Sequence, residues 1–136
     1  MLTNKIVYMQ SSPTPKPTES ELSILNILWN REQASVREVH EALSEHKISG
    51  YTTTLKLMQI MFEKGIVSRD ASSKVHIYRP NITKENTQQQ LVGKMITNLF
   101  GGSSSQLVLQ ALGNHQPNTA ELAEIEALIA QLKKNK

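Results

Sequence analysis

Residues 49–70 read SGYTTTLKLMQIMFEKGIVSRD, and this stretch decides the fold that we predict for the chain. A helix begins after Ser49 or Gly50 and carries three consecutive threonines in its first turns. Apolar side chains at helical spacing then continue to Lys64. Gly65 follows at the position where helices commonly end in a residue with positive φ. The stretch therefore predicts a helix with a small, polar start that leads directly into a β-strand.

Two further helices precede this one, and each begins with a capping box. Thr18 with Glu21, and Ser35 with Glu38, follow the pattern in which two side chains cap each other's backbone amides. The first helix carries an apolar face that includes Trp29. We expect Trp29 to pack in the core, under the hairpin, or wing, that follows the third helix. The second is short and is expected to end near residue 46.

A hairpin follows the third helix. The runs IVSRD and KVHIYRP alternate about the polar turn ASSK, which predicts two antiparallel strands. We expect Val67, Val75 and Ile77 to face inward. Three helices followed by a hairpin match the order of a winged helix-turn-helix, with the hairpin as the wing.

Three more helices are predicted at residues 83–100, 105–112 and 119–134, and Thr83 caps the first. Their apolar stripes are too few and too one-sided to form a core alone, so the simplest partner is a second copy of the chain. The dimerisation residues that we predict are Leu91, Met95, Leu99, Phe100, Leu107, Val108, Leu122, Ile125, Leu128 and Ile129.

The predicted fold class is mainly α with a small β-hairpin wing: a winged helix-turn-helix followed by a C-terminal helical dimerisation region. Residues 1–17 are expected to form a flexible N-terminal tail, because three prolines fall within five residues of SSPTPKP. The winged-helix DNA-binding domain is expected at 18–82 and the dimerisation region at 83–136.

The composition excludes several classes of protein. The 136 residues include no cysteine, which excludes disulfides, thiolate metal sites and a cysteine nucleophile, and fits a reducing cytoplasm. No run approaches the length of a membrane span, and the N-terminus lacks the apolar core of a signal peptide. We therefore expect a cytoplasmic protein. A net charge of +3 permits binding to nucleic acid without demonstrating it.

The threonines suit a helix that enters the major groove of DNA, because the first turns of such a helix must be small and polar to approach base edges. Lys56 and Gln59 lie one turn further on the outward side, and the preceding helix and the wing add phosphate-binding groups. The DNA-binding residues that we predict are Ser35, Arg37, Tyr51, Thr52, Thr53, Lys56, Gln59, Arg69, Lys74 and His76.

Each of these residues also has a simpler interpretation. Thr52 and Thr53 can be ordinary residues of a first helical turn, and Lys56 can be a solvated surface lysine. Tyr51 can stack near a sugar-phosphate or seal the core between the helices. The sequence alone leaves these alternatives open.

No catalytic or metal-binding set emerges from the remaining residues. The four histidines are scattered, and none of them follows a metal-binding spacing. GGSSS, at residues 101–105, lacks the lysine of a phosphate-binding loop. We predict no enzymatic activity, no metal and no cofactor.

The ordered set of motifs resembles the penicillinase-repressor family, of the BlaI/MecI type. The resemblance rests on PTESELSILNILWN, ASVREVHEAL, GYTTTLKLMQIMFEKGIVSRD, VHIYRP and NLFGGSSSQLVLQAL, and it covers most of the chain from Thr18. Members of the family usually carry valine at the position of Thr54, and the N-terminal tail has no counterpart in the family.

The resemblance implies a homodimeric repressor that sits on a palindromic double-stranded DNA operator and blocks transcription. It also implies relief of repression when a membrane metalloprotease receptor system triggers cleavage in the dimerisation region. The corresponding cleavage region here is Leu109, Gln110 and Ala111, which lacks the Asn-Phe pair of the staphylococcal repressors. Two rival functions stay open: a winged-helix module that binds another protein, and a ligand-responsive regulator without proteolytic control.

Overall fold

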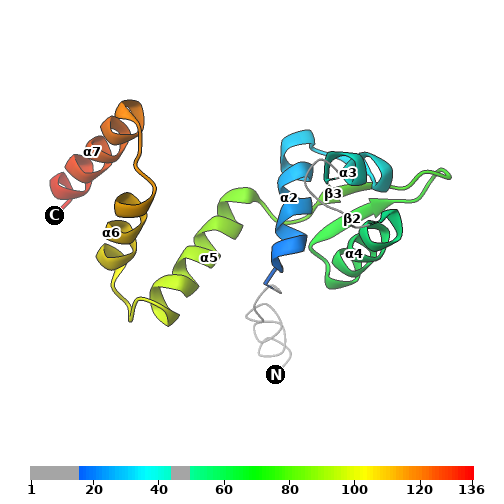
Figure 1. Cartoon of the computed structure of the whole chain (residues 1–136), viewed down its shortest axis with the longest axis horizontal. Coiled ribbons are helices and arrows are strands. Elements are labelled where there is room, and N and C mark those ends of the chain that lie inside the picture. Colours follow the sequence, from blue (N-terminus) through cyan, green and yellow to red (C-terminus); the bar gives the residue numbers. More distant parts are fainter. Residues whose placement is uncertain (1–15, 44–49) are drawn as a thin grey trace, which may run out of the picture. The chain divides into compact units, whose positions relative to one another are not determined.

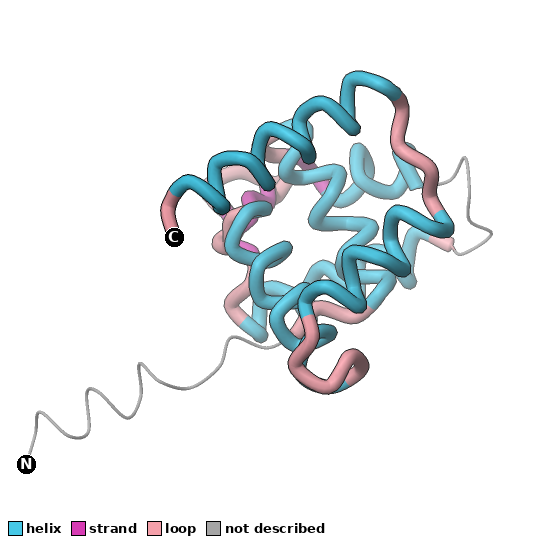
Figure 2. Tube along the Cα trace, turned by 90° about the vertical axis from the view of Figure 1, so that its left-hand side faces the viewer, coloured by secondary structure: helices cyan, strands magenta, loops and turns pink. Residues whose placement is uncertain are grey.

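A computed structural model of the chain describes residues 16–43 and 50–136 (Figure 1). The elements in these ranges are α2 (Glu19–Arg31), β1 (Ala34–Ser35), α3 (Val36–Leu43), α4 (Tyr51–Lys64), β2 (Val67–Asp70), β3 (Ile77–Pro80), α5 (Lys84–Asn98), α6 (Ser104–Asn114) and α7 (Thr119–Lys134). Most of the predicted tail and the predicted end of the second helix lie outside the described residues. Helices make up most of the described trace (Figure 2), and the three strands form one small sheet.

The chain divides into two compact units, residues 1–89 and 90–136, and α5 spans the boundary between them. Within the described ranges, no helix has both the length and the apolar character that crossing a membrane requires.

Both predicted capping boxes are confirmed. The Thr18 N–H donates to Oε1 of Glu21 at 2.9 Å, and the Glu21 N–H donates to Oγ1 of Thr18 at 3.2 Å. The same reciprocal pair links Ser35 and Glu38, at 2.9 and 3.2 Å. Because each pair satisfies backbone donors that have no partner inside the helix, α2 and α3 begin where the sequence predicts.

The end of α4 also follows the prediction. Gly65 has a φ of 84°, and its N–H donates to the carbonyl of Phe62 at 3.0 Å. A residue with a Cβ is strained at this φ, so glycine stops the helix there at little cost. The chain then enters β2 through the buried Ile66.

The sheet contains a third strand that the sequence analysis missed. Its order is β1-β3-β2, with both neighbours antiparallel to β3. β1 has only two residues, which is too short for alternation to reveal it. The expectation that Val75 faces inward is wrong: its side chain is 60% exposed because it lies in the turn before β3. Tyr78, 1% exposed, contributes to the core from β3, while Val67 is buried as predicted.

The core of the first unit lies between α2, α3, α4 and the sheet. Its buried hydrophobic residues are Ile24, Leu25, Leu28, Ala34, Val36, Val39, Met58, Met61, Ile66, Val67 and Tyr78. Trp29 packs against this core as predicted, and its Nε1–H donates to the carbonyl of Ile82 at 2.9 Å. It therefore lies beside the segment that leaves β3 rather than under the turn of the wing.

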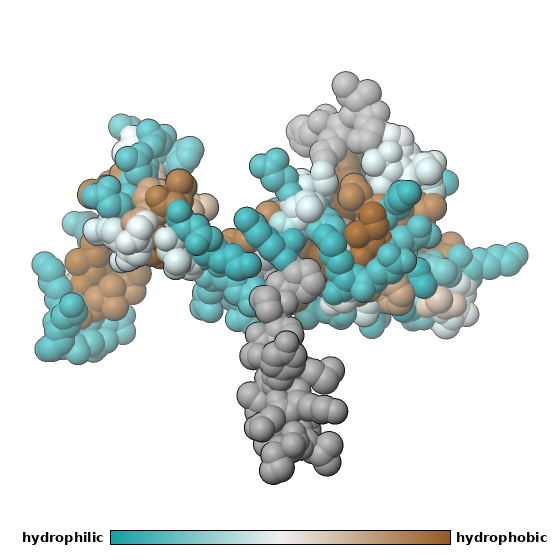
Figure 3. Space-filling view, turned by 90° about the horizontal axis from the view of Figure 1, so that it is seen from below, coloured by the Kyte–Doolittle hydropathy of each residue, from teal (hydrophilic) through white to brown (hydrophobic). Residues whose placement is uncertain are grey.

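The second unit has no comparable core. Neither α6 nor α7 buries a single residue, and the only residue that α5 buries is Thr87. Ser103 caps α6 and Asn118 caps α7 through side-chain oxygens. Figure 3 shows hydrophobic side chains on the surface of these C-terminal helices, at the left of the view.

The residues that we predict at a dimer interface are all accessible in the single chain. Six are exposed hydrophobic residues, and they are Met95, Leu99, Val108, Leu122, Leu128 and Ile129. The other four are partly exposed, and they are Leu91, Phe100, Leu107 and Ile125. These helices therefore present apolar stripes that nothing within 90–136 covers.

Candidate nucleic-acid interface

The exposed side of α4 carries a stripe of polar side chains between residues 52 and 59. Thr52, Thr53, Lys56 and Gln59 are exposed, whereas Thr54 on the opposite face is 3% exposed. This separation follows from the helical period, which turns one stripe toward the core and leaves the other to solvent. Gly50 is the N-cap of α4 and provides no side-chain cap, so the start of the helix is not crowded by a capping side chain.

The start of α3 lies next to this face, but its two predicted residues differ in accessibility. Ser35 is 7% exposed, and its hydroxyl accepts the Glu38 N–H. The hydrogen bonds from Ser35 hold the pKa of the Glu38 carboxyl below its ordinary value. Arg37 is exposed. The contacts of Ser35 and Arg37 with phosphates stay predictions. Of the two side chains, that of Arg37 is the more accessible.

Tyr51, the first residue of α4, packs against two side chains of α3. The Arg37 guanidinium carbon lies 5.5 Å from the centre of the Tyr51 ring. The His40 ring meets the Tyr51 ring edge-on, with 5.8 Å between centres and an interplanar angle of 80°. The Tyr51 ring nevertheless stays 40% exposed. It therefore joins α3 to α4 at the surface rather than filling the core.

His40 makes a second contact with α4 that the sequence analysis did not predict. Its Nδ1 lies 2.9 Å from Oγ1 of Thr54, within hydrogen-bond distance. The sequence shows only that Thr54 is a polar residue within the inward stripe of α4, which indicates that its hydroxyl needs a partner. The sequence does not indicate which residue of the neighbouring helix is that partner.

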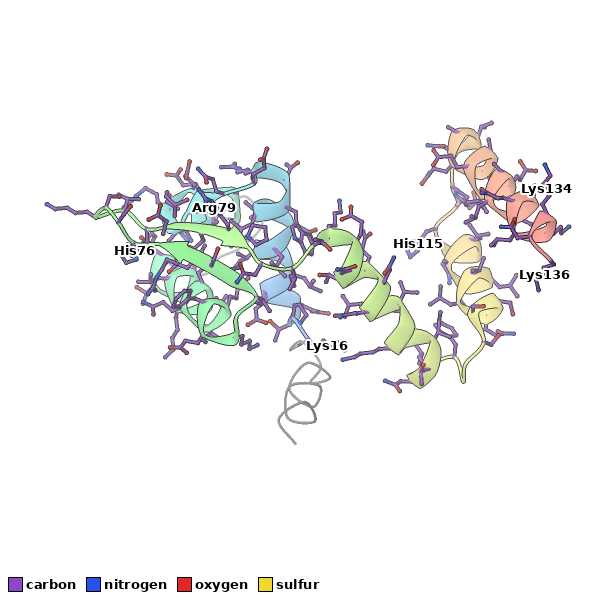
Figure 4. All side chains as sticks on the ribbon, turned by 180° about the vertical axis from the view of Figure 1, so that it is seen from behind. Lys16, His76, Arg79, His115, Lys134 and Lys136 are labelled. Carbon is purple, nitrogen blue, oxygen red and sulfur yellow. The ribbon has the colours of Figure 1, made fainter. Side chains whose placement is uncertain are left out.

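The wing places basic side chains beside α4. The Arg69 guanidinium carbon lies 4.1 Å from the centre of the Phe62 ring, so a residue of β2 stacks on a residue of α4. Lys74 is exposed in the turn, and His76 is partly exposed just before β3. Figure 4 labels His76 on the wing and Arg79 farther along the hairpin.

The turn of the wing is ordered by its own polar groups. Oδ1 of Asp70 accepts the Ser72 N–H at 2.9 Å, and this bond holds the pKa of the Asp70 carboxyl below its ordinary value. The Ser73 hydroxyl donates to the carbonyl of Val75 at 3.0 Å. These bonds shape the loop that carries Lys74.

An open groove of about 440 Å³ lies between α3, α4 and the wing. Seven of the ten predicted DNA-binding residues line it, and they are Ser35, Arg37, Tyr51, Gln59, Arg69, Lys74 and His76. The remaining three, Thr52, Thr53 and Lys56, do not line this groove. The groove therefore gathers cationic side chains from three elements beside the polar face of α4, an arrangement suited to a polyanion.

Arg79 is a further cation that the sequence analysis missed. It is exposed on β3, and its Nε–H donates to Oε1 of Gln33 at 2.7 Å. Its place in the alternation, next to the buried Tyr78, could have indicated an outward side chain. Among the described residues, no group of three or more His, Cys, Asp or Glu side chains is placed to hold a metal ion.

Comparison with known proteins gives consistent matches. The profile of a protein family described as "Penicillinase repressor" matches residues 17–131. The "Penicillinase repressor" of Staphylococcus aureus is 24% identical to the chain, and the match covers 85% of this chain and 91% of that protein. The "Transcriptional regulator BlaI" of Mycobacterium tuberculosis is 36% identical over 61 residues, which are 44% of each protein.

One solved structure is also similar. The solution structure of the DNA binding domain of the repressor BlaI aligns with a TM-score of 0.49 at 22% identity, covering 54% of this chain and 90% of that chain.

Proposed function

The chain belongs to the penicillinase repressor family, and from this premise we propose that it acts as a homodimer on a palindromic operator. It is a DNA-binding transcriptional repressor of the BlaI/MecI type, and its family consists of repressors rather than enzymes. The membership confirms both the resemblance drawn from the motifs and the prediction that the chain is not an enzyme.

One observation carries the proposed mode of DNA binding. The exposed face of α4 holds Thr52 and Thr53 in its first turn and Lys56 and Gln59 beyond it, and a cationic groove lies beside this face. We infer that α4 enters the major groove, where Thr52 and Thr53 allow close approach to base edges. Lys56 and Gln59 then read guanine or adenine.

The cations around the groove are proposed to grip the phosphates. Arg37, Arg69 and Lys74 come from α3, β2 and the wing turn, so they can follow the backbone on either side of α4. Such contacts supply much of the affinity, carry little sequence information and weaken as salt rises. The exposed face of α4, with Thr52, Thr53, Lys56 and Gln59, is then expected to decide which DNA sequence is bound.

Dimerisation is proposed to occur through the C-terminal helices. The apolar stripes of α5, α6 and α7 are accessible, and α6 and α7 bury no residue. These stripes need a covering surface, and a second copy of the chain offers the same apolar stripes. Two copies related by a two-fold axis would present two α4 helices to the two half-sites of a palindrome. Loss of the dimer would remove the contacts with the second half-site. Binding to the operator would then weaken, and repression would be relieved.

Proteolysis is the proposed route to that loss. Leu109, Gln110 and Ala111 are all exposed on α6, and Leu109 is 64% exposed. A cut there would separate α7 from the rest of the chain and remove part of the proposed interface. The expected partner is a membrane metalloprotease receptor system that triggers the cut.

A selection experiment tests the function. The full chain would be incubated with a random duplex DNA library, and the bound duplexes would be sequenced and then titrated at several salt concentrations. We expect a palindromic consensus and an affinity that falls steeply with salt. If no duplex outcompetes random DNA, the DNA-reading role is wrong and the protein-interaction alternative gains support. A non-palindromic consensus bound by a single chain would contradict only the proposed dimer and not the DNA-reading role.

A further inference from the structure

Thr54 is a buried hydroxyl on the helix that is proposed to read DNA. It is 3% exposed among hydrophobic residues of α4, and Oγ1 lies 2.9 Å from Nδ1 of His40 on α3. A hydroxyl in such a place is unfavourable unless it is hydrogen-bonded. The bond to His40 therefore holds Thr54 to one particular position against α3.

The same histidine also contacts the first residue of α4. Its ring meets Tyr51 edge-on, and Tyr51 in turn lies under the guanidinium of Arg37. Residues 51 and 54 are three apart on a helix, so they lie on neighbouring parts of one face. One α3 side chain thus fixes the first turn of α4 at two points. Thr52 and Thr53 lie between those points and face solvent.

We propose that His40 and Thr54 are positioning residues that set the rotation and depth at which Thr52 and Thr53 meet a base edge. This inference rests on the proposed DNA-reading function of α4. Base contacts tolerate little displacement, whereas the flexible cations of the wing can reach a phosphate from several positions. The His40–Thr54 bond therefore acts on the discrimination between sequences more than on the affinity for DNA in general.

The decisive variant is Thr54→Val, which keeps the shape of the side chain and removes the hydroxyl. Thr54→Ser is its matched control, because it keeps the hydroxyl. The measured quantity is the ratio of the affinity for the best duplex selected by the wild-type chain to the affinity for random duplex DNA. We expect Thr54→Val to lower this ratio about threefold to tenfold and Thr54→Ser to change it less than about twofold.

Two substitutions of His40 separate its contacts. His40→Asn retains a polar group near the position of Nδ1, and His40→Phe retains a ring against Tyr51. If the hydrogen bond does the positioning, His40→Phe lowers the ratio as Thr54→Val does. The double variant His40→Phe/Thr54→Val then lowers it by clearly less than the product of the two single effects.

A merely structural role predicts a different result. Reduced folding lowers the active fraction and weakens both duplexes equally, which leaves the ratio unchanged. The inference is overturned if Thr54→Val, shown by circular dichroism to be folded, retains the wild-type ratio. If Thr54→Val does not fold, an unchanged ratio for folded His40→Phe overturns it equally. Failure of the wild-type chain to select any duplex would instead refute the proposed function itself.

Discussion

The ammonium of Lys64, at the end of α4, lies 2.9 Å from Oε2 and 3.0 Å from Oε1 of Glu21 in α2. The Glu21 side chain is 2% exposed, whereas that of Lys64 is 31% exposed. Oε1 of Glu21 also accepts the Thr18 N–H in the capping box. One buried carboxylate therefore joins the beginning of α2 to the end of the proposed recognition helix.

This asymmetry predicts which partner is harder to replace. Lys64→Met leaves a buried carboxylate without its cation, and we expect it to lower the free energy of unfolding by about 1–3 kcal/mol. Glu21→Gln keeps an acceptor for the Thr18 N–H, and the partly exposed ammonium of Lys64 can be hydrated, so this substitution should cost less. Urea unfolding of both variants measures the difference. A greater loss for Glu21→Gln than for Lys64→Met would contradict this account.

The cap of α3 predicts a dependence of stability on pH. The hydrogen bonds from Ser35 lower the pKa of Glu38 from its ordinary 4.5 in the folded state. A lowered folded pKa means that the stabilisation is fully present above about pH 4.5 and is lost as the pH falls through the folded pKa. Glu38→Gln should therefore flatten the stability profile in this acidic window and leave its slope near neutrality unchanged. Thermal unfolding from pH 3 to 7 would measure the profiles.

Ser35→Ala provides the complementary variant. It removes the hydroxyl that accepts the Glu38 N–H and should cost about 1 kcal/mol at neutral pH. An acidic slope that persists unchanged in Glu38→Gln would show that other carboxylates produce it.

A strained residue at the end of α2 predicts a stabilising substitution. Glu32 has a φ of 74° and is the only non-glycine residue with positive φ among the described residues. Glycine adopts this conformation without a Cβ clash, so Glu32→Gly should raise the free energy of unfolding by about 1 kcal/mol. Arg31→Gly, in the last turn of the helix, is the control and should lower it by about 0.5–1 kcal/mol. Destabilisation by both substitutions would show that Glu32 carries no releasable strain.

The sequence predicted those features of the fold that depend on local signals. The two capping boxes, the glycine after α4 and the limits of α7 arise from residues a few positions apart, and all appear as predicted. β1 was missed because a strand of two residues exists only through its pairing with β3. Val75 was misplaced because alternation gives no warning that a strand begins two residues later.

The candidate interface shows the same division. Exposure of Thr52, Thr53, Lys56 and Gln59 follows from the period of one helix, so it could be predicted. The contact of His40 with Thr54 joins residues 14 positions apart on two helices. No pattern within either helix specifies that pairing, because it depends on how the helices pack. The stacking of Arg69 on Phe62 was missed for the same reason.

Lys56 provides the direct test of base reading. It is exposed on α4, and if it contacts a base, Lys56→Ala should weaken binding to the selected operator by about 1–3 kcal/mol. Lys74→Ala, in the wing, is the matched comparison: it should weaken selected and random duplexes alike and reduce the salt dependence. Titration of both variants against both duplexes makes the distinction. An unchanged operator affinity in Lys56→Ala would remove Lys56 from the reading set.

The proposed dimer can be tested on two faces of one helix. Ile129 is 46% exposed and belongs to the apolar stripe of α7, whereas Ala127 lies on the other side of the helix. Ile129→Glu would place a charge in the proposed interface, so light scattering should report a single chain at concentrations where the wild type is a dimer. Operator affinity should then fall about 100-fold or more, because the two half-sites are no longer bound together. Ala127→Glu adds the same charge to the same helix and should leave both the mass and the affinity unchanged. If Ile129→Glu remains dimeric, the apolar stripe of α7 is not the interface. If the wild-type chain is monomeric, binding to two coupled half-sites cannot explain its affinity for the operator.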